Sequence, residues 1–365
     1  MKNYPVPAHS GILSLKPYVG GASSVKGKDR VIKLSSNESA FGTSPAAMEA
    51  CRNFADRLFR YPDGGATDLR RAIAEKHGLD ADRIVCGDGS DELIGLLCHA
   101  YLKEHDEVVI SQYAFSMYRL YAIGCGASPV TAPEKDFKID TQAVLKTVNS
   151  RTRMIFITNP GNPTGTYLST DELRALCRKL PDKVMIVIDS AYAEFVDHED
   201  YCAGAELVDE FPNVVMLRTF SKIYGLGGVR LGWSYSSKEI ADVLNRIRGP
   251  FNVNAVAQVA GVAALKDEEF VKRAFEHNRK WLAKLPAELE AIGLKMTPSV
   301  ANFVLVHFPE NAGKSAEKAD AFLQDRGIIV RRVVSYGLPD ALRMTIGRDE
   351  EMAELLSALK DFMSA

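Results

Sequence analysis

The middle of the chain alternates short apolar runs with segments of helical periodicity. Residues 184–188 are apolar at every position, as expected for a strand that is covered on both faces of a parallel sheet. Further apolar runs lie at 83–86, 108–110, 153–158 and 214–217. The alternation of such runs with helical segments predicts an α/β fold with a central, mostly parallel sheet.

Several of the helices between these runs carry recognisable end signals. Ser44 followed by Pro45 is typical of an N-cap with proline at the first helical position, which predicts a helix over 45–57. A second helix is predicted over 68–77 and ends at Gly78, and a third over 91–102. Ser169 and Glu172 have the spacing of a capping box, which predicts a helix that runs to Leu180.

The pattern changes near residues 249–251. A long helical stretch is predicted over 254–289, followed by strands at 302–306, 327–331 and 341–346, which together indicate a smaller α+β domain. A chain of 365 residues is also long for one core. We therefore expect an N-terminal arm with part of the small domain over 1–37, a large domain over 38–253, and the small C-terminal domain over 254–365.

Composition excludes several classes of function. A net charge of −2 creates no field that favours nucleic acid or a membrane surface, and no apolar run has the length of a membrane span. The N-terminus has no signal-peptide apolar core. Six cysteines form no C-x-x-C pair and seven histidines show no metal-ligand spacing, so we expect reduced thiols, no metal and a cytoplasmic location.

Lys222 is the most informative residue for chemistry. The apolar run 214–217 leads into a loop in which Thr219 and Ser221 can bind a phosphate and Arg230 can neutralise it. A lysine in a crowded pocket beside an anion site is a candidate for Schiff-base formation. A solvated surface lysine is the ordinary alternative, and the other strand ends decide between the two.

The loop at 86–92 joins a strand to a helix, so its backbone N–H groups and the helix dipole can hold a phosphate. Gly87 and Gly89 fit a dinucleotide fingerprint, but its third glycine position is Glu92, and the match fails. The chain also has no G-K-[ST] phosphate loop. A plain glycine turn remains the alternative for this segment.

Two further strand ends carry polar groups. The loop at 159–165 holds two prolines and two glycines around Asn162, which could point into a cleft or belong to a simple turn. Asp189 ends the most apolar strand, just before Tyr192. A carboxylate there could pair with a buried cation such as a protonated heteroaromatic nitrogen, or could merely cap a loop.

In combination, these segments resemble the fold-type I enzymes that use pyridoxal 5′-phosphate (PLP), specifically the aminotransferases. Three motifs carry the resemblance: N-P-G-N-P-T-G with Asn162, D-S-A-Y with Asp189, and S-K-I-Y-G-L-G-G-V-R with Lys222 and Arg230. The spacings between these four residues, in order, are 27, 33 and 8 positions. Within that superfamily the chain is similar to the histidinol-phosphate aminotransferase family, through the segments at 15–18, 34–38, 60–64, 248–253 and 342–347. The resemblance implies an α/β large domain plus a smaller α+β domain, and transfer of an amino group between L-histidinol phosphate and 2-oxoglutarate in histidine biosynthesis.

The resemblance also implies roles around the cofactor. Lys222 would hold PLP as a Schiff base and later move the substrate proton, and Asp189 would keep the ring nitrogen protonated. Tyr192 and Asn162 would hydrogen-bond the phenolic oxygen of the ring, and Phe115 would stack on it. The phosphate would be held by Ser90, Asp91, Thr219, Ser221 and Arg230.

For the substrate, the resemblance implies binding by Tyr18, Asn37, Tyr61, Asn162, Arg331 and Arg343. Tyr61 would reach the cofactor and substrate of a partner subunit, so a homodimer is expected. The sequence departs from the family's usual pattern at Ser190, where glutamate is common, and at 39–42, which borders the substrate.

Other functions stay open at this stage. An aromatic amino-acid aminotransferase and a PLP lyase such as a threonine-phosphate decarboxylase would share the cofactor residues. A cofactor-sensing domain of a transcription regulator would need a DNA-binding segment, and fewer than 40 residues precede the fold here. A nicotinamide dehydrogenase is disfavoured by the failed glycine fingerprint.

Overall fold

The computed structural model describes residues 6, 11–309 and 313–365. A seven-stranded sheet has the strand order β2-β10-β9-β8-β7-β3-β4. Its strands are β2 (Ile84–Gly87), β3 (Glu107–Ser111), β4 (Ser128–Ala132), β7 (Thr152–Thr158), β8 (Met185–Asp189), β9 (Val214–Thr219) and β10 (Gly232–Tyr235). Only β10 runs antiparallel to its neighbours, so the predicted α/β fold with a mostly parallel sheet is confirmed.

Both faces of this sheet are buried. Along β8, Ile186 and Ile188 belong to one apolar core while Val187 between them belongs to another. Successive side chains of a strand point to opposite faces, so a strand that is apolar throughout needs a cover on each side. The covering helices are α1 (Pro45–Phe54), α2 (Thr67–His77), α3 (Gly89–Tyr101), α4 (Ser116–Gly124), α5 (Thr141–Thr147), α6 (Thr170–Lys179), α7 (Ala205–Glu210), α8 (Lys238–Ile247) and α9 (Ala255–Lys266).

The predicted helix end signals at Ser44, Gly78 and Ser169 are confirmed, although the helix expected over 91–102 spans Gly89–Tyr101 (α3). Ser44 accepts a hydrogen bond from the backbone N–H of Ala47 (3.3 Å) at the start of α1, and Ser169 and Glu172 form both bonds of the capping box of α6. Gly78 ends α2 with φ 64°, a left-handed conformation that glycine adopts without strain. The helix expected over 45–57 is α1 followed by one 3-10 turn at Ala55–Arg57.

A four-stranded sheet with the order β11-β12-β15-β14 lies beyond the large one. Its strands are β11 (Lys295–Thr297), β12 (Phe303–His307), β14 (Arg331–Val333) and β15 (Leu338–Thr345), covered by α11 (Ala316–Asp325) and α12 (Asp349–Ser364). The single strand expected over 327–331 is instead two strands, because β13 (Ile328–Ile329) pairs with β1 (Ile32–Lys33) and Arg331 begins a new pairing with β15.

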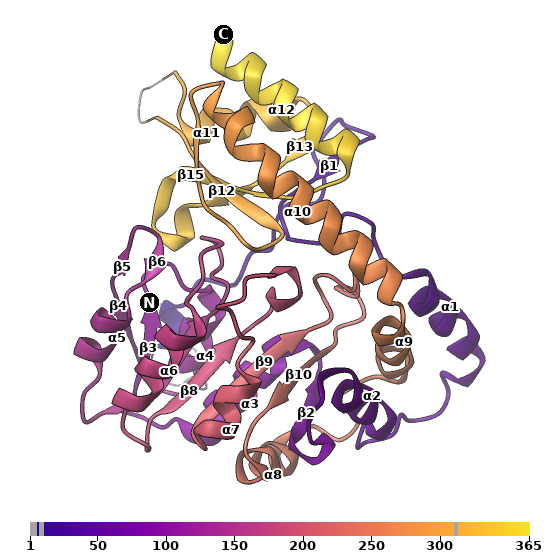
Figure 1. Ribbon diagram of the computed structural model, residues 1–365, viewed down its shortest axis with the longest axis vertical. Helices are drawn as coiled ribbons and strands as arrows, with labels where there is room; N and C mark the ends of the chain where they lie inside the picture. The colour runs from indigo at the N-terminus through magenta and orange to yellow at the C-terminus, as the bar shows by residue number, and fades with distance from the viewer. Residues whose placement is uncertain (1–5, 7–10, 310–312) are drawn as a thin grey trace.

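The helical stretch expected over 254–289 is also two elements, α9 and α10 (Glu268–Glu290). Asp267 breaks it, since its carboxylate accepts hydrogen bonds from Phe270 N–H (3.2 Å) and from the Ser44 hydroxyl (2.5 Å). Figure 1 shows α10 running from α9, beside the large sheet, to the small sheet. The division of the chain after residues 37 and 253 remains a prediction.

Candidate active site

The carboxyl ends of six parallel strands meet at one edge of the large sheet, and a cavity of about 300 Å³ lies there. Its lining residues are Ser36, Glu38, Ser90, Asp91, Phe115, Thr158, Asn162, Asp189, Ala191, Tyr192, Thr219, Ser221, Lys222, Gly227 and Arg230. Arg230 reaches the same edge because it precedes β10, which runs in the opposite direction. The structure thus brings together every predicted cofactor residue except Tyr61.

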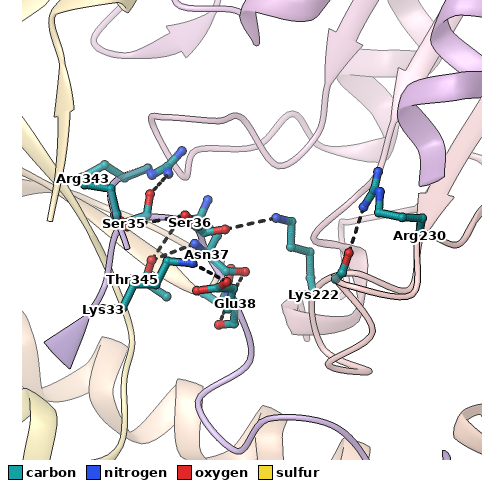
Figure 2. A network of polar contacts seen from close by, with 12 residues as sticks. Lys33, Ser35, Ser36, Asn37, Glu38, Lys222, Arg230, Arg343 and Thr345 are labelled. Carbon is teal, nitrogen blue, oxygen red and sulfur yellow. Dashed lines mark hydrogen bonds and ion pairs between the residues drawn. The ribbon is translucent and has the colours of Figure 1, made fainter. Parts of the chain in front are cut away.

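Lys222 follows β9, and its side chain contacts the chain segment that precedes α1. Its Nζ lies 3.4 Å from the carbonyl oxygen of Ser36 and 5.6 Å from the centre of the Tyr192 ring. Figure 2 shows the side chain extending toward Ser36. Burial, with the positive charge of Arg343 as a second cause, lowers the pKa of Lys222 to about 8. A large fraction of the amine is therefore neutral near pH 8, as nucleophilic attack on a carbonyl requires.

Asp189 is buried at the end of β8. Its Oδ2 accepts a hydrogen bond of 2.6 Å from the Tyr118 hydroxyl, whereas Oδ1 is buried without a partner among the described residues. Burial raises the pKa of this carboxyl group. An unpartnered carboxylate oxygen on a cavity wall fits a ligand that brings a positively charged donor, such as the protonated ring nitrogen of PLP.

Another group of residues in the cavity wall fits an anion. Ser90 and Asp91 lie in the first turn of α3, where free backbone N–H groups and the helix dipole favour negative charge. Thr219 Oγ1 donates to Ser221 Oγ over 3.0 Å, and Arg230 lies beside them in the cavity wall. A side chain at Gly89 would collide with the Arg230 guanidinium, so glycine is needed for this close approach.

Asn37 connects the cavity to the small sheet. Its side-chain Nδ2 donates to the Tyr192 hydroxyl (2.9 Å), and its backbone N–H donates to Thr345 Oγ1 (2.9 Å) on β15. Asn302 Nδ2 in turn donates to the Asn37 carbonyl oxygen (3.1 Å). Asn37 has φ 55°, a left-handed conformation that asparagine tolerates better than most residues. It therefore orients Tyr192 as well as bordering the predicted substrate position.

A second cavity of about 130 Å³ adjoins the first. It is lined by Tyr18, Gly21, Ser35, Ser36, Asn37, Phe115, Asn162, Tyr192, Lys222, Arg331, Tyr336 and Arg343. Arg343 is buried and donates to Asn162 Oδ1 (2.6 Å) and to the Ser35 carbonyl oxygen (2.8 Å), while Arg331 donates to the Val19 carbonyl oxygen (2.9 Å). All predicted substrate residues except Tyr61 thus line one cavity.

Tyr61 lies elsewhere within this chain. Its side chain is 83% exposed and stacks on Phe251 with 4.7 Å between ring centres, beside exposed Leu58 and Phe59. Some residues that were not predicted as site residues also belong to the site, among them Glu38 in the cavity wall and Tyr118, which contacts Asp189. For Tyr118 a signal existed in its spacing, because it lies three residues after Phe115, which immediately precedes helix α4.

Among residues 6, 11–309 and 313–365, no group of three or more His, Cys, Asp or Glu could hold a metal ion. No helix in the same part of the chain is long and apolar enough to cross a membrane.

The chain is similar to known aminotransferases along almost its whole length. Residues 29–359 match the family of class I and II aminotransferases. Histidinol-phosphate aminotransferases of Maricaulis maris and Paramagnetospirillum magneticum are each 52% identical to the chain, over 99% of both sequences. The crystal structure of histidinol-phosphate aminotransferase from Sinorhizobium meliloti in complex with PLP matches with a TM-score of 0.88 and 28% identity, over 97% of both chains.

Proposed function

Because the chain belongs to the class I and II aminotransferase family, we propose that it moves an amino group between L-histidinol phosphate and 2-oxoglutarate, in histidine biosynthesis. The observation that carries the PLP chemistry is the placement of Lys222 and of the unpartnered Asp189 Oδ1 in one cavity. The choice of substrate is supported by the 52% identity with histidinol-phosphate aminotransferases. PLP, when bound there, supplies an electron sink that lets the substrate Cα–H bond break.

The residues around the cavity have different roles in this proposed reaction. Lys222 would hold the cofactor through its aldehyde carbon, and its amine would take and return the Cα proton of the substrate. Asp189 would accept the ring N–H at Oδ1, which has no partner among the described residues, and Phe115 in the cavity wall would stack on the ring. Tyr192, whose hydroxyl is oriented by Asn37, would hydrogen-bond the phenolic oxygen of the ring together with Asn162.

The second cavity suits a substrate with an anionic end. Arg331 and Arg343 are directly opposite one another on β14 and β15, so their side chains leave the sheet on the same face. Like charges so placed repel each other, and their hydrogen bonds go to neutral oxygens. A phosphate or carboxylate between them would relieve this repulsion. The phosphate of histidinol phosphate and the distal carboxylate of glutamate could both use this site in turn.

An absorbance titration of the PLP-loaded protein tests the substrate assignment. Histidinol phosphate, glutamate and phenylalanine are added separately in single-turnover experiments, and loss of the Schiff-base band is followed. We expect fast loss with histidinol phosphate and glutamate and much slower loss with phenylalanine. Comparable rates with phenylalanine would instead indicate an aromatic or dual-specificity aminotransferase, and a protein without the band would reject the cofactor assignment.

We further propose a homodimer in which Tyr61 completes the partner's site. Support comes from the exposed apolar patch formed by Leu58, Phe59, Tyr61 and Phe251, which is unusual for a surface without a partner. Mixing Lys222→Ala subunits with Tyr61→Ala subunits tests it. If each site uses Tyr61 from the partner, heterodimers contain one intact site, and activity should recover to about a quarter of wild type by statistical assortment. No recovery would reject a shared site.

We also propose a cytoplasmic location, which is supported by the six free thiols, since a reducing compartment keeps cysteines in this state.

A further inference from the structure

Helix α4 presents one face to the floor of the cofactor cavity. Phe115 immediately precedes the helix and lines the cavity, and Tyr118 and Tyr121 follow at intervals of three residues. Residues three apart lie on the same side of a helix. Each tyrosine hydroxyl bonds a carboxylate of the cavity wall, Tyr118 to Asp189 Oδ2 (2.6 Å) and Tyr121 to Asp91 Oδ2 (2.7 Å).

The Tyr118 ring is held in place by packing as well as by its hydroxyl contacts. The side chain is fully buried, stacks on Phe156 with ring centres 4.4 Å apart, and meets the edge of Phe115 at 5.7 Å. Its hydroxyl also lies 2.9 Å from Thr158 Oγ1. Because the Tyr118 proton points to the carboxylate, Thr158 is the donor in that contact. The chain of donors therefore runs from Thr158 to Tyr118 to Asp189.

These hydrogen bonds act on the Asp189 carboxylate, which burial would otherwise shift toward its protonated, neutral form. A carboxylate without water around it favours its protonated form, and a hydrogen bond donated to the ionised form opposes that preference. A protonated Asp189 could not pair with a protonated ring nitrogen. The Tyr118 bond also occupies Oδ2, which leaves Oδ1 as the oxygen available to a ligand.

We propose that Tyr118 is a positioning residue for cofactor recognition, holding Asp189 ionised and oriented so that Oδ1 receives the ring N–H of PLP. The inference rests on the proposed function, because it takes PLP to be the cofactor. Tyr118 itself touches neither substrate nor cofactor in this arrangement, and its effect passes through Asp189.

The test compares two hydroxyl deletions on the same helix, Tyr118→Phe and Tyr121→Phe. Both keep the aromatic ring and remove one hydrogen bond to a carboxylate, but only the first changes Asp189. Dissociation constants are measured on the cofactor-free protein for PLP and for an analogue with carbon in place of the ring nitrogen. We expect Tyr118→Phe to weaken PLP binding about tenfold, the usual size for loss of a charge-assisted hydrogen bond.

The analogue separates a positioning role from a merely structural one. It has no ring N–H for Oδ1, so Tyr118→Phe should change its affinity by less than about twofold. Tyr121→Phe should affect PLP and the analogue equally. Equal weakening of both ligands by Tyr118→Phe, or unchanged PLP affinity, would overturn the inference. Wild-type protein that does not bind PLP would instead overturn the proposed function.

Thermal melting of each cofactor-free variant checks the fold. If Tyr118→Phe does not fold, Thr158→Val takes its place, because it removes the hydroxyl that donates to Tyr118 and keeps a β-branched side chain. Thr158→Val should then weaken the binding of PLP more than the binding of the analogue, although by a smaller factor than Tyr118→Phe. Equal losses for the two ligands would again overturn the inference.

Discussion

Arg343 Nη1 donates a hydrogen bond of 2.6 Å to Asn162 Oδ1, although the two residues lie 181 positions apart. The contact joins β15 of the small sheet to the loop that follows β7 of the large sheet. Asn162 and the Ser35 carbonyl oxygen together hold the guanidinium at the cavity before any substrate arrives. Binding of an anion then needs little ordering of this side chain, which favours affinity.

Replacing Arg343 with lysine should therefore impair binding of glutamate. A lysine keeps the charge but cannot form the two-pronged contact of a guanidinium with a carboxylate. We expect the KM for glutamate to rise about tenfold to a hundredfold, in line with loss of a buried charge-assisted hydrogen bond. Steady-state kinetics with glutamate as amino donor measure the change.

Arg332→Lys is the matched control. Arg332 is the next residue after Arg331 on β14, so its side chain leaves the opposite face of the sheet, where it lies 3.7 Å from Glu317. Its replacement should leave the KM unchanged. A similar rise in both variants would contradict a specific role for Arg343.

Lys222→Ala should abolish transamination and leave the protein folded. The amine is the only group of the site proposed to bind the cofactor covalently and to move the Cα proton, and general acid–base catalysis alone contributes about a hundredfold to ten-thousandfold. Turnover and the melting temperature of the cofactor-free protein are measured together. Turnover near the wild-type value would show that another group performs these steps.

Capture of PLP by the cofactor-free protein should depend on pH through Lys222. The pKa of this amine is lowered to about 8, so the reactive neutral form increases as pH rises through that value and is dominant above it. Stopped-flow absorbance should show a capture rate that rises with pH and levels off above a midpoint near 8. A midpoint near about 10, the value of a solvated lysine, would contradict a buried amine.

Asp189→Asn should lower turnover without harming the fold. An amide cannot hold the positive charge on a ring nitrogen, and loss of such electrostatic stabilisation costs about a hundredfold to a thousandfold in kcat. The cofactor-free variant should melt no lower than wild type, because the change removes an unpartnered buried carboxylate oxygen. Turnover and thermal melting are the two measurements.

Asp320→Asn provides the control for this substitution. Asp320, on α11, is also buried with an unpartnered Oδ1, its Oδ2 accepts a hydrogen bond from Gln324 (2.9 Å), and burial raises its pKa. It lies outside the cavity, so its replacement should leave turnover unchanged. An equal loss of turnover in the two variants would mean that the effect of Asp189→Asn arises from a general change in the core.

The sequence alone determined several strands and capped helix ends of the large domain, and the order in which the candidate site residues follow one another along the chain. Capping at Ser169 and Glu172 and the stop at Gly78 are local effects, decided by bonds within a few residues, so pattern reasoning places them well. The meeting of Asp189 and Lys222 also follows from sequence, because carboxyl ends of neighbouring parallel strands must share an edge of the sheet.

Contacts between distant segments were decided only by the tertiary structure. Asp267 breaks the long helix partly because Ser44, 223 positions away, reaches its carboxylate, and residues 328–329 leave the small sheet because β1 offers a partner. The bond from Tyr118 to Asp189 likewise spans 71 positions. No local periodicity encodes such contacts, since each depends on how whole elements pack and on which buried polar atoms then need a partner.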